Sequence, residues 1–244
     1  MAETNFNGLS MHRITETDFD CVKKFLLTDF LYNEPLCRSI SLNAEDSDEL
    51  FNGPTNPLFL TDLVNSGIAS SLSYMLRKPD GEIAALRLAS ILNRPEDEQH
   101  NEHSERSSGS KSATSGSNKR TATKTMSPKA QIIMDILEEL ESKASISVYL
   151  QIWILIDPKL KRLLLWSVIS VHKDYTRRGL AEKMLSYKLE EAKQMGCQGC
   201  VAEASAFKSQ LLFKKIGYET IYEIKHADWL DDKGRQIFKC DDST

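Results

Sequence analysis

The sequence lacks any run of apolar residues long enough to cross a bilayer. A membrane-spanning helix needs about 20 consecutive apolar residues. The longest candidate, residues 148–166, is interrupted by a proline and four charged residues. The first residues of the chain are polar and contain no apolar stretch of the kind found in signal peptides. We therefore expect no membrane partner and a cytoplasmic location.

An excess of positive charge is also missing. The 244 residues include 31 Lys and Arg against 35 Asp and Glu, which gives a net charge of -4. A nucleic-acid surface needs clustered positive charge, so the composition argues against nucleic acid as a partner. Hydrophobic residues make up 41% of the chain, enough for a sizeable core. The length fits a single domain, residues 1–244, that contains an insertion.

The cysteines do not form a recognisable metal or disulfide framework. There are five, an odd number, and without a secretory signal we expect reduced thiols. Cys197 and Cys200 form a C-x-x-C pair, but a tetrahedral zinc site needs two more ligands and no other Cys or His has a matching spacing. The pair also follows a predicted helix, whereas a redox motif would open one. We interpret both as small buried residues and expect no metal.

Large apolar side chains are absent from one long internal segment. Residues 93–127 contain no Leu, Ile, Val, Phe, Tyr or Trp and are rich in Ser, Thr, Lys and Glu. Such a segment cannot bury enough apolar surface to offset the entropy lost on ordering. The sequence therefore predicts a disordered polar insertion over residues 93–129.

On both sides of this insertion, strand and helix patterns alternate. Helices are predicted from apolar spacing of three and four residues, strands from short apolar or alternating runs, and turns from Gly, Pro and Asp. In chain order we expect a strand at 11–15, helices at 17–30 and 50–63, a hairpin of 68–77 with 82–92, a helix at 130–142, extended segments at 149–156 and 163–171, a helix at 178–195, a strand at 201–204, a helix at 209–216 and a hairpin of 218–225 with 236–240.

The most informative segment is a predicted strand that ends at Val171, followed by a basic turn and a helix. The free backbone N–H groups at the start of a helix converge and carry partial positive charge, which favours phosphate. Gly179 and Ala181 are small and allow an anion to approach the backbone. Arg177 and Arg178 add charge that does not titrate near neutrality. The segment therefore predicts a phosphate-binding turn.

Three kinds of phosphate turn compete for this segment. A Walker loop needs G-x-x-x-x-G-K-[ST], which the chain lacks. A Rossmann turn needs G-x-G-x-x-G, but Gly179 stands alone. The third kind is the acetyl-CoA turn of the GNAT acetyltransferases, Arg/Gln-x-x-Gly-x-Gly/Ala between a strand and a helix. Residues 176–181 match its Gly-x-Ala end and depart from it at Thr176. Taken alone, these six residues favour a basic helix start with no ligand.

The rest of the chain resembles the GNAT fold, an α/β fold with a central mixed sheet flanked by helices. More narrowly, it is similar to the invertebrate arylalkylamine N-acetyltransferases on both sides of the insertion. Four strings carry this resemblance: Asn33-Glu34-Pro35-Leu36-Cys37, residues 133–141, Ser170-Val171-His172-Lys173-Asp174-Tyr175 leading to Gly179-Leu180-Ala181, and residues 205–210 running on to Lys215-Ile216-Gly217-Tyr218.

The resemblance implies transfer of an acetyl group from acetyl-CoA, as co-substrate, to the primary amine of a small arylalkylamine such as dopamine, serotonin or tyramine. Two alternatives stay open. One is a GNAT enzyme for polyamines or peptide amines, and the other is a CoA-binding regulatory protein that does not catalyse. Thr176 keeps the second alternative open, as does Phe213, which stands where many GNAT enzymes carry an acidic Tyr. We expect a monomer.

The resemblance also implies the catalytic residues. An alkylamine has a pKa of about 10, so only about one molecule in a thousand is free base at pH 7 and a base is required. Glu34 is the base that the resemblance implies, and Pro35 restricts it to extended conformations. Ser205 and Ser209, four residues apart at a predicted helix start, would relay a proton or position the amine. Capping of the helix is the alternative role for Ser205.

Cofactor contacts are expected along the strand and the turn. The backbone N–H groups of Ile169, Ser170 and Val171 would stabilise the oxyanion, particularly if this strand splays from the one at 201–204. His172 lies just beyond the strand, and we expect a structural or solvent-facing role for it. The pyrophosphate would lie on the turn formed by Thr176, Arg177, Arg178, Gly179, Leu180 and Ala181.

Overall fold

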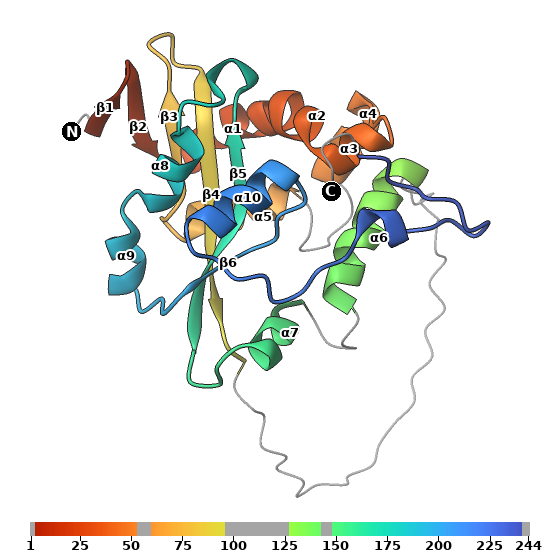
Figure 1. Cartoon of the computed structure of the whole chain (residues 1–244). Helices are drawn as coiled ribbons and strands as arrows, with labels where there is room; N and C mark the ends of the chain where they lie inside the picture. The colour runs from red at the N-terminus through yellow and green to blue at the C-terminus, as the bar shows by residue number, and fades with distance from the viewer. Residues whose placement is uncertain (1–2, 53–59, 96–126, 143–147, 241–244) are drawn as a thin grey trace, which may run out of the picture.

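A mixed β-sheet forms the centre of the molecule (Figure 1). The computed structural model describes residues 3–52, 60–95, 127–142 and 148–240. The first five strands are antiparallel, and β5 and β6 are parallel. Within the described residues the sheet has six strands in chain order: β1 Glu3–Phe6, β2 Leu9–Arg13, β3 Tyr74–Arg77, β4 Ile83–Asn93, β5 Arg162–Val171 and β6 Cys200–Ala202.

Helices surround the sheet. They are α1 Phe19–Phe25, α2 Leu31–Asn33, α3 Pro35–Ser39, α4 Ala44–Asn52, α5 Leu60–Ala69, α6 Pro128–Ser142, α7 Val148–Leu155, α8 Leu180–Ser186, α9 Leu189–Gln194 and α10 Phe207–Lys215. A wide π-type turn, η2 (Leu26–Phe30), joins α1 to α2, and 3-10 turns lie at η1 Glu16–Asp18, η3 Lys173–Tyr175 and η4 His226–Asp228. The expected insertion at 93–129 falls mostly on residues outside the described ranges.

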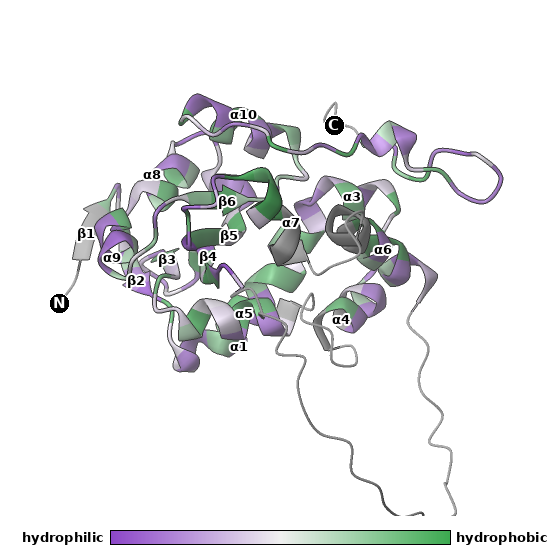
Figure 2. Ribbon diagram, turned by 90° about the horizontal axis from the view of Figure 1, so that it is seen from below, coloured by the Kyte–Doolittle hydropathy of each residue, from purple (hydrophilic) through white to green (hydrophobic). Residues whose placement is uncertain are grey.

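The helices lie on both faces of the sheet. Figure 2 shows α1 and α5 on one side of the strands and α8 and α10 on the other. The core on the first side joins Leu86, Leu88 and Val168 to residues of α1, α5 and α6. On the second side Leu164 and Trp166 pack against residues of α8, α9 and α10. The apolar spacing of the helices thus serves separate clusters on the two faces, and a third cluster joins residues of β2, β3 and β4 to Leu180 and Met184 of α8.

A β-bulge in the middle of β5 decides which residues face which core. Val168 lies opposite Leu88 and Trp166 lies opposite Ala89, so Ser167 is an extra residue on β5. In a regular strand Trp166 and Val168 would share a face. Because of the bulge, Trp166 packs under α8–α10, while Val168 packs on the side of α1 and α5. A bulge also bends its strand, and here the bend lies just where β6 stops pairing.

The extended segment expected at 149–156 is wrong, because these residues form the helix α7. An apolar run without a period cannot separate a buried strand from a buried helix. The end of α7 is held by Arg94, whose guanidinium donates to the carbonyl oxygens of Trp153 and Asp157 at 2.8 and 2.9 Å. Arg94 also stacks on the Trp153 ring, 4.8 Å from its centre. These contacts satisfy carbonyl groups that a helix leaves unpaired at its end.

Three further expectations are corrected. The helix predicted over 178–195 is divided into α8 and α9 at Lys188, which has a φ of 49°. The predicted strand 68–77 is confined to β3, and its first residues end α5. The C-terminal hairpin is reduced to one bridge, between Leu230 and Gln236, in the described part of the chain. Ile221 stays exposed there, and no sheet edge in the described part pairs with residues 218–225.

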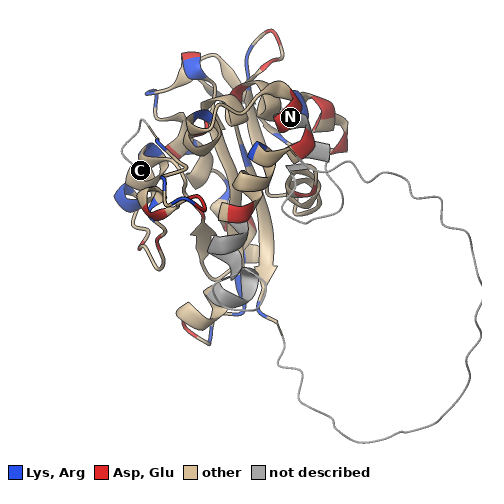
Figure 3. Ribbon diagram, turned by 90° about the vertical axis from the view of Figure 1, so that its right-hand side faces the viewer, with Lys and Arg blue, Asp and Glu red and all other residues tan. Residues whose placement is uncertain are grey.

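The surface mixes charges of both signs. On the face that Figure 3 shows, Lys and Arg are scattered among Asp and Glu. No helix in the described ranges is both long and apolar enough to span a membrane. No group of three His, Cys, Asp or Glu in these ranges is arranged to hold a metal ion.

Candidate active site

The strand β5 is open on one side over its second half. β6 pairs with Leu164, Leu165 and Trp166 only, while β5 continues to Val171. In the described residues, Ser167 to Val171 therefore have no strand partner on the β6 side. Pairing with β6 thus ends at the bulge and leaves the β6 side of the end of β5 as an unpaired edge, called here the opening beside β5.

The register shows which backbone groups face this opening. The backbone N–H of His172 donates to the carbonyl oxygen of Ala84, in β4, at 2.9 Å. In an antiparallel ladder the N–H groups alternate between the two sides of a strand. The N–H of Ser170 is thus directed toward β4, and those of Ile169 and Val171 are directed toward the opening. Of the three backbone donors expected from the sequence, the register leaves these two available.

The expected phosphate turn follows directly. After η3, Arg177 and Gly179 both have positive φ, 61° and 73°, and Gly179 is the N-cap of α8. No side chain in the described part of the chain caps this helix, and a backbone hydrogen bond runs from the N–H of Lys183 to the oxygen of Gly179. The N–H groups of the first turn of α8 are therefore without partners inside the helix. Residues 176–179 are all exposed.

Two side chains of the turn donate hydrogen bonds to backbone carbonyl oxygens of the residues just before it. Thr176, which departs from the expected pattern, donates its hydroxyl to the carbonyl oxygen of Lys173 at 3.0 Å. Arg178 donates to the carbonyl oxygen of Asp174 at 2.8 Å and lies over the ring of Tyr175, 4.7 Å from its centre. A Cβ added at Gly179 would meet no atom within 4 Å. The turn is thus held by contacts of its own residues and leaves space above Gly179.

Glu34 lies between α2 and α3 and has two distinct carboxylate oxygens. Its backbone is extended, at φ -68° and ψ 127°, with Pro35 at the start of α3, as the sequence predicts. Oε2 accepts the backbone N–H of Cys37 at 2.7 Å and so caps α3. Oε1 is buried and has no hydrogen-bond partner within the described residues. A buried oxygen left without a donor is costly, so this atom is a candidate for binding a ligand or a proton.

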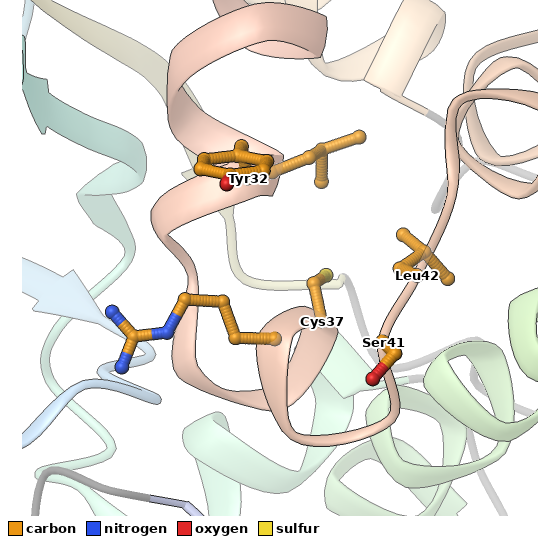
Figure 4. A pocket seen from close by; sticks show the side chains of 6 residues that line it. Tyr32, Cys37, Ser41 and Leu42 are labelled. Carbon is orange, nitrogen blue, oxygen red and sulfur yellow. The ribbon is translucent and has the colours of Figure 1, made fainter.

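A cavity of about 420 Å³ adjoins Glu34 through Cys37 (Figure 4). Its lining consists of Leu31, Tyr32, Cys37, Arg38, Ser41 and Leu42. Cys37 is buried, and burial together with the nearby Glu34 charge raises the pKa of its thiol well above the usual value. Tyr32 is 73% exposed and stands at the edge of the cavity. The cavity thus combines apolar walls, an aromatic ring and one cationic side chain.

The expected serines are placed by α10, but not as the spacing suggests. The N-cap of α10 is Ala206, so Ser205 precedes the helix and does not cap it. Ser209 is the third residue of the helix, and its N–H donates to the oxygen of Ala206 at 2.9 Å. The two serines therefore do not share a helix face, although both are half-buried. Within the described residues the Glu34 carboxylate accepts its hydrogen bond from the backbone N–H of Cys37 and not from either serine.

Phe213, in α10, packs against Tyr218, which follows the helix. Their ring centres are 4.9 Å apart, and Phe213 is buried. The indole N–H of Trp166 donates to the hydroxyl of Tyr218 at 2.6 Å, so Tyr218 joins β5 to the segment after α10. Burial raises the pKa of the Tyr218 hydroxyl far above its usual value. A hydroxyl that holds its proton so firmly, with a packing role, is a poor acid for the open side of β5.

Comparison with solved structures identifies the fold. Arylalkylamine N-acetyltransferase 2 from Aedes aegypti has a TM-score of 0.66 and 22% identity, over 96% of this chain and 94% of that one. An agmatine N-acetyltransferase mutant has a TM-score of 0.63 and 15% identity, over 96% and 93%. A mosquito arylalkylamine N-acetyltransferase like 5b has a TM-score of 0.61 and 15% identity, over 95% of this chain and 93% of that one. The chain has the GNAT acetyltransferase fold. No family model matches it, and no curated protein matches its sequence.

In this fold a second acidic residue, Asp29, contacts His172 just before the turn at 176–181. Asp29, in η2, is 6% exposed, and its Oδ2 lies 3.6 Å from Nε2 of His172. Asp29 is not among the residues predicted from the sequence, although the sequence contains a signal for it. Val22, Phe25 and Leu26 form an apolar stripe, and Asp29 occupies the next position of that stripe, seven residues after Val22. An acid at such a position needs a polar partner in the core.

Proposed function

We propose that this chain is an acetyl-CoA-dependent N-acetyltransferase that acts on the primary amine of a small arylalkylamine, by direct transfer within a ternary complex. The observation that carries the proposal is Oε1 of Glu34, a buried carboxylate oxygen with no hydrogen-bond partner among the described residues. It lies in the segment that follows α2, in a GNAT fold. The opening beside β5 and the turn at 176–181 supply the second half of such a site.

The chemistry requires three proton or charge events, and the chain has a group for each. Glu34 takes a proton from the ammonium, directly or through water, so that the free amine attacks the thioester carbonyl. The backbone N–H groups of Ile169 and Val171 donate to the oxyanion that forms. The C–S bond then breaks, and the proton that the attacking nitrogen loses is relayed by Ser205 or Ser209 to the departing thiolate.

The co-substrate is held mainly by the backbone. Unpaired N–H groups at the start of α8 bind the pyrophosphate, and Gly179 lets it approach closely. Arg177 and Arg178 add positive charge beside it. Because backbone groups do most of this binding, the departure at Thr176 is compatible with the proposal.

The cavity beside Cys37 supports an aryl substrate over a polyamine. Among the described residues that line it, Arg38 is the one charged residue and none is Asp or Glu. A polyamine carries a second ammonium group, which a cation in the lining would repel. Tyr32 and Leu42 offer apolar surface to a ring. The agmatine N-acetyltransferase neighbour keeps the polyamine alternative as the second candidate.

The deciding experiment measures thiol release from acetyl-CoA with a panel of amines. We expect the highest kcat/KM with tryptamine, tyramine or serotonin, and much lower values with spermidine, agmatine and a peptide amine. A preference for spermidine or agmatine would support the polyamine alternative. Calorimetric titration with CoA runs beside the assay. Binding of CoA without turnover of any amine would contradict the enzyme proposal and support a CoA-binding regulatory protein.

A further inference from the structure

Asp29 is a buried carboxylate with a specific set of partners. The side-chain amide of Asn33 lies 3.4 Å from its Oδ1 and donates to its backbone oxygen at 2.7 Å. The backbone N–H of Lys173 also favours the charged carboxylate and partly offsets the rise in its pKa that burial causes. His172 faces the other oxygen at 3.6 Å. Two of these partners belong to the end of the cofactor strand, and one belongs to the segment that carries Glu34.

His172 has both ring nitrogens engaged. Nδ1 accepts the backbone N–H of Asp174 at 3.2 Å, which leaves the proton of the neutral ring on Nε2. Nε2 faces Asp29. The ring therefore has no free nitrogen with which to take a proton from the amine. Its remaining charged neighbour is the carboxylate of Asp174, 3.7 Å from Nδ1.

The pair links two parts of the site that are far apart in sequence. On one side Asn33, bonded to Asp29, directly precedes Glu34, and the backbone N–H of Glu34 donates to the oxygen of Phe30 within the same turn. On the other side the His172 ring packs on Tyr175, 6.2 Å between centres, and Tyr175 carries the Arg178 guanidinium. A continuous chain of contacts thus runs from Glu34 to the phosphate turn.

We propose that Asp29 and His172 act as a positioning pair, which holds the end of the cofactor strand against the segment that carries Glu34. The proposal rests on the proposed function, in which Glu34 is the base and the turn binds CoA. A carboxylate at this position is costly to bury unless it is paired, so the contact fixes the distance between the two segments. The wide π-type turn η2 gives Asp29 its place in the core, and such turns are frequent at functional sites.

The test combines substitutions that keep side-chain shape. Asp29→Asn and His172→Gln each should lower kcat about tenfold, because a small displacement of the base from the amine is enough for such a loss. The double variant should lower kcat no further than either single one, because both remove the same link. CoA affinity should fall several-fold in each variant and again not additively.

Glu34→Gln supplies a readout that a merely structural pair would not change. In that background the base is already lost, so Asp29→Asn should alter kcat less than about twofold while it still weakens CoA. Matched controls are Asp46→Asn, a buried carboxylate in α4 that is also 6% exposed, and His12→Gln on β2. Both should leave kcat and CoA affinity within about twofold.

The outcomes separate the two proposals. If the wild type turns over, three results would overturn the positioning pair and leave the proposed enzyme intact. They are additive losses of kcat in the double variant, an Asp29→Asn effect that is as large in the Glu34→Gln background as in the wild type, and no loss of kcat in any variant. A protein that binds CoA but acetylates no amine would overturn the proposed function. The CoA titrations of the single and double variants would then decide whether the pair holds the turn. Variants that unfold are recognised by circular dichroism, and His172→Asn replaces His172→Gln in that case.

Discussion

Oε2 of Glu34 accepts the backbone N–H of Cys37 at 2.7 Å, while Oε1 of the same carboxylate has no partner among the described residues. One residue therefore caps α3 and also presents a buried, unpaired acceptor. Pro35 restricts the backbone of Glu34, and the hydrogen bond to Cys37 fixes its side chain. Together they hold the carboxylate in one direction. A rigidly held carboxylate is what a proton acceptor needs, since it loses little entropy when the amine arrives.

Replacing Glu34 by Ala should lower kcat/KM for the preferred amine by about 100-fold or more at pH 7. The loss should shrink toward pH 10, where about half of the amine is already free base. A pH series of initial rates checks this. The lost cap should also cost about 1 kcal/mol of stability, which urea unfolding measures. An equal loss of activity at all pH values would assign Glu34 to the cap alone.

Cys37 should resist alkylation in the folded protein. Burial and the Glu34 carboxylate raise the pKa of its thiol well above the usual value, and only the thiolate reacts quickly. We expect mass spectrometry after iodoacetamide at pH 8 to find Cys37 unmodified in buffer and labelled in urea. Cys21, which is half-buried, serves as the comparison. Rapid labelling of Cys37 without denaturant would show that the cavity wall opens.

The parts of the fold that the sequence predicts well are those in which one pattern determines one element. The strand β5 follows from one apolar run. The hairpin of β3 and β4 follows from two apolar runs on either side of a Pro-Asp-Gly turn. The bulge at Ser167 could not be predicted, because Leu163 to Trp166 are all apolar and give no alternation to follow. The helix α7 was missed for the same reason.

The candidate site shows a similar division. Gly179 at a positive φ and Glu34 before Pro35 are local features, so their backbone conformations follow from the sequence. The open side of β5 depends on where β6 stops pairing, which is a tertiary property. The contact of Asp29 with His172 joins residues 143 positions apart, and only the acid within an apolar stripe hinted at it.

Arg87 should be a major contributor to stability. It is 1% exposed, lies 5.0 Å from the ring centres of both Tyr74 and Trp166, and donates to the carbonyl oxygens of Met184 and Leu185. Burial lowers its pKa to about 10, so it remains charged at neutral pH. Arg87→Ala should cost about 3 kcal/mol in urea unfolding, because it leaves a void and unpaired carbonyls.

Arg87→Lys should also destabilise the protein, since an ammonium group can neither stack between two rings nor match both carbonyls. The control is Lys193→Ala, which breaks an exposed pair with Glu190 and should change stability by less than about 0.5 kcal/mol. If Arg87→Ala changed the free energy of unfolding by as little as Lys193→Ala, Arg87 would not be a major contributor to stability.

Asp29 should reduce stability at neutral pH. Burial raises its pKa above the ordinary value of 3.8, so the folded state binds this proton more tightly than the unfolded state. Between 3.8 and the raised pKa, stability therefore falls as the pH rises, and the cost persists above that range. Relative to wild type, Asp29→Asn should be most favourable at pH 7 and should lose that advantage toward pH 4. Urea unfolding at both pH values measures the difference in stability between the variant and the wild type. An advantage of Asp29→Asn that grows toward pH 4 would contradict the raised pKa of Asp29.

Gly179→Ala should separate backbone strain from the loss of a binding surface. Its φ of +73° costs an alanine about 1 kcal/mol, and the new Cβ would meet no protein atom within 4 Å. Gly234 is a matched control, because its φ is +72° and its surroundings are equally open, but it lies in the turn between Leu230 and Gln236. Both variants should lose similar stability in urea.

Only Gly179→Ala should weaken CoA, by about tenfold or more, because its methyl group would project into the space where the pyrophosphate approaches the start of α8. Calorimetric titration of both variants with CoA makes the comparison at equal backbone strain. Equal CoA affinities would mean that the pyrophosphate does not lie over Gly179. A loss shared by both variants would instead trace to strain transmitted through the fold, since Gly234 lies outside the turn.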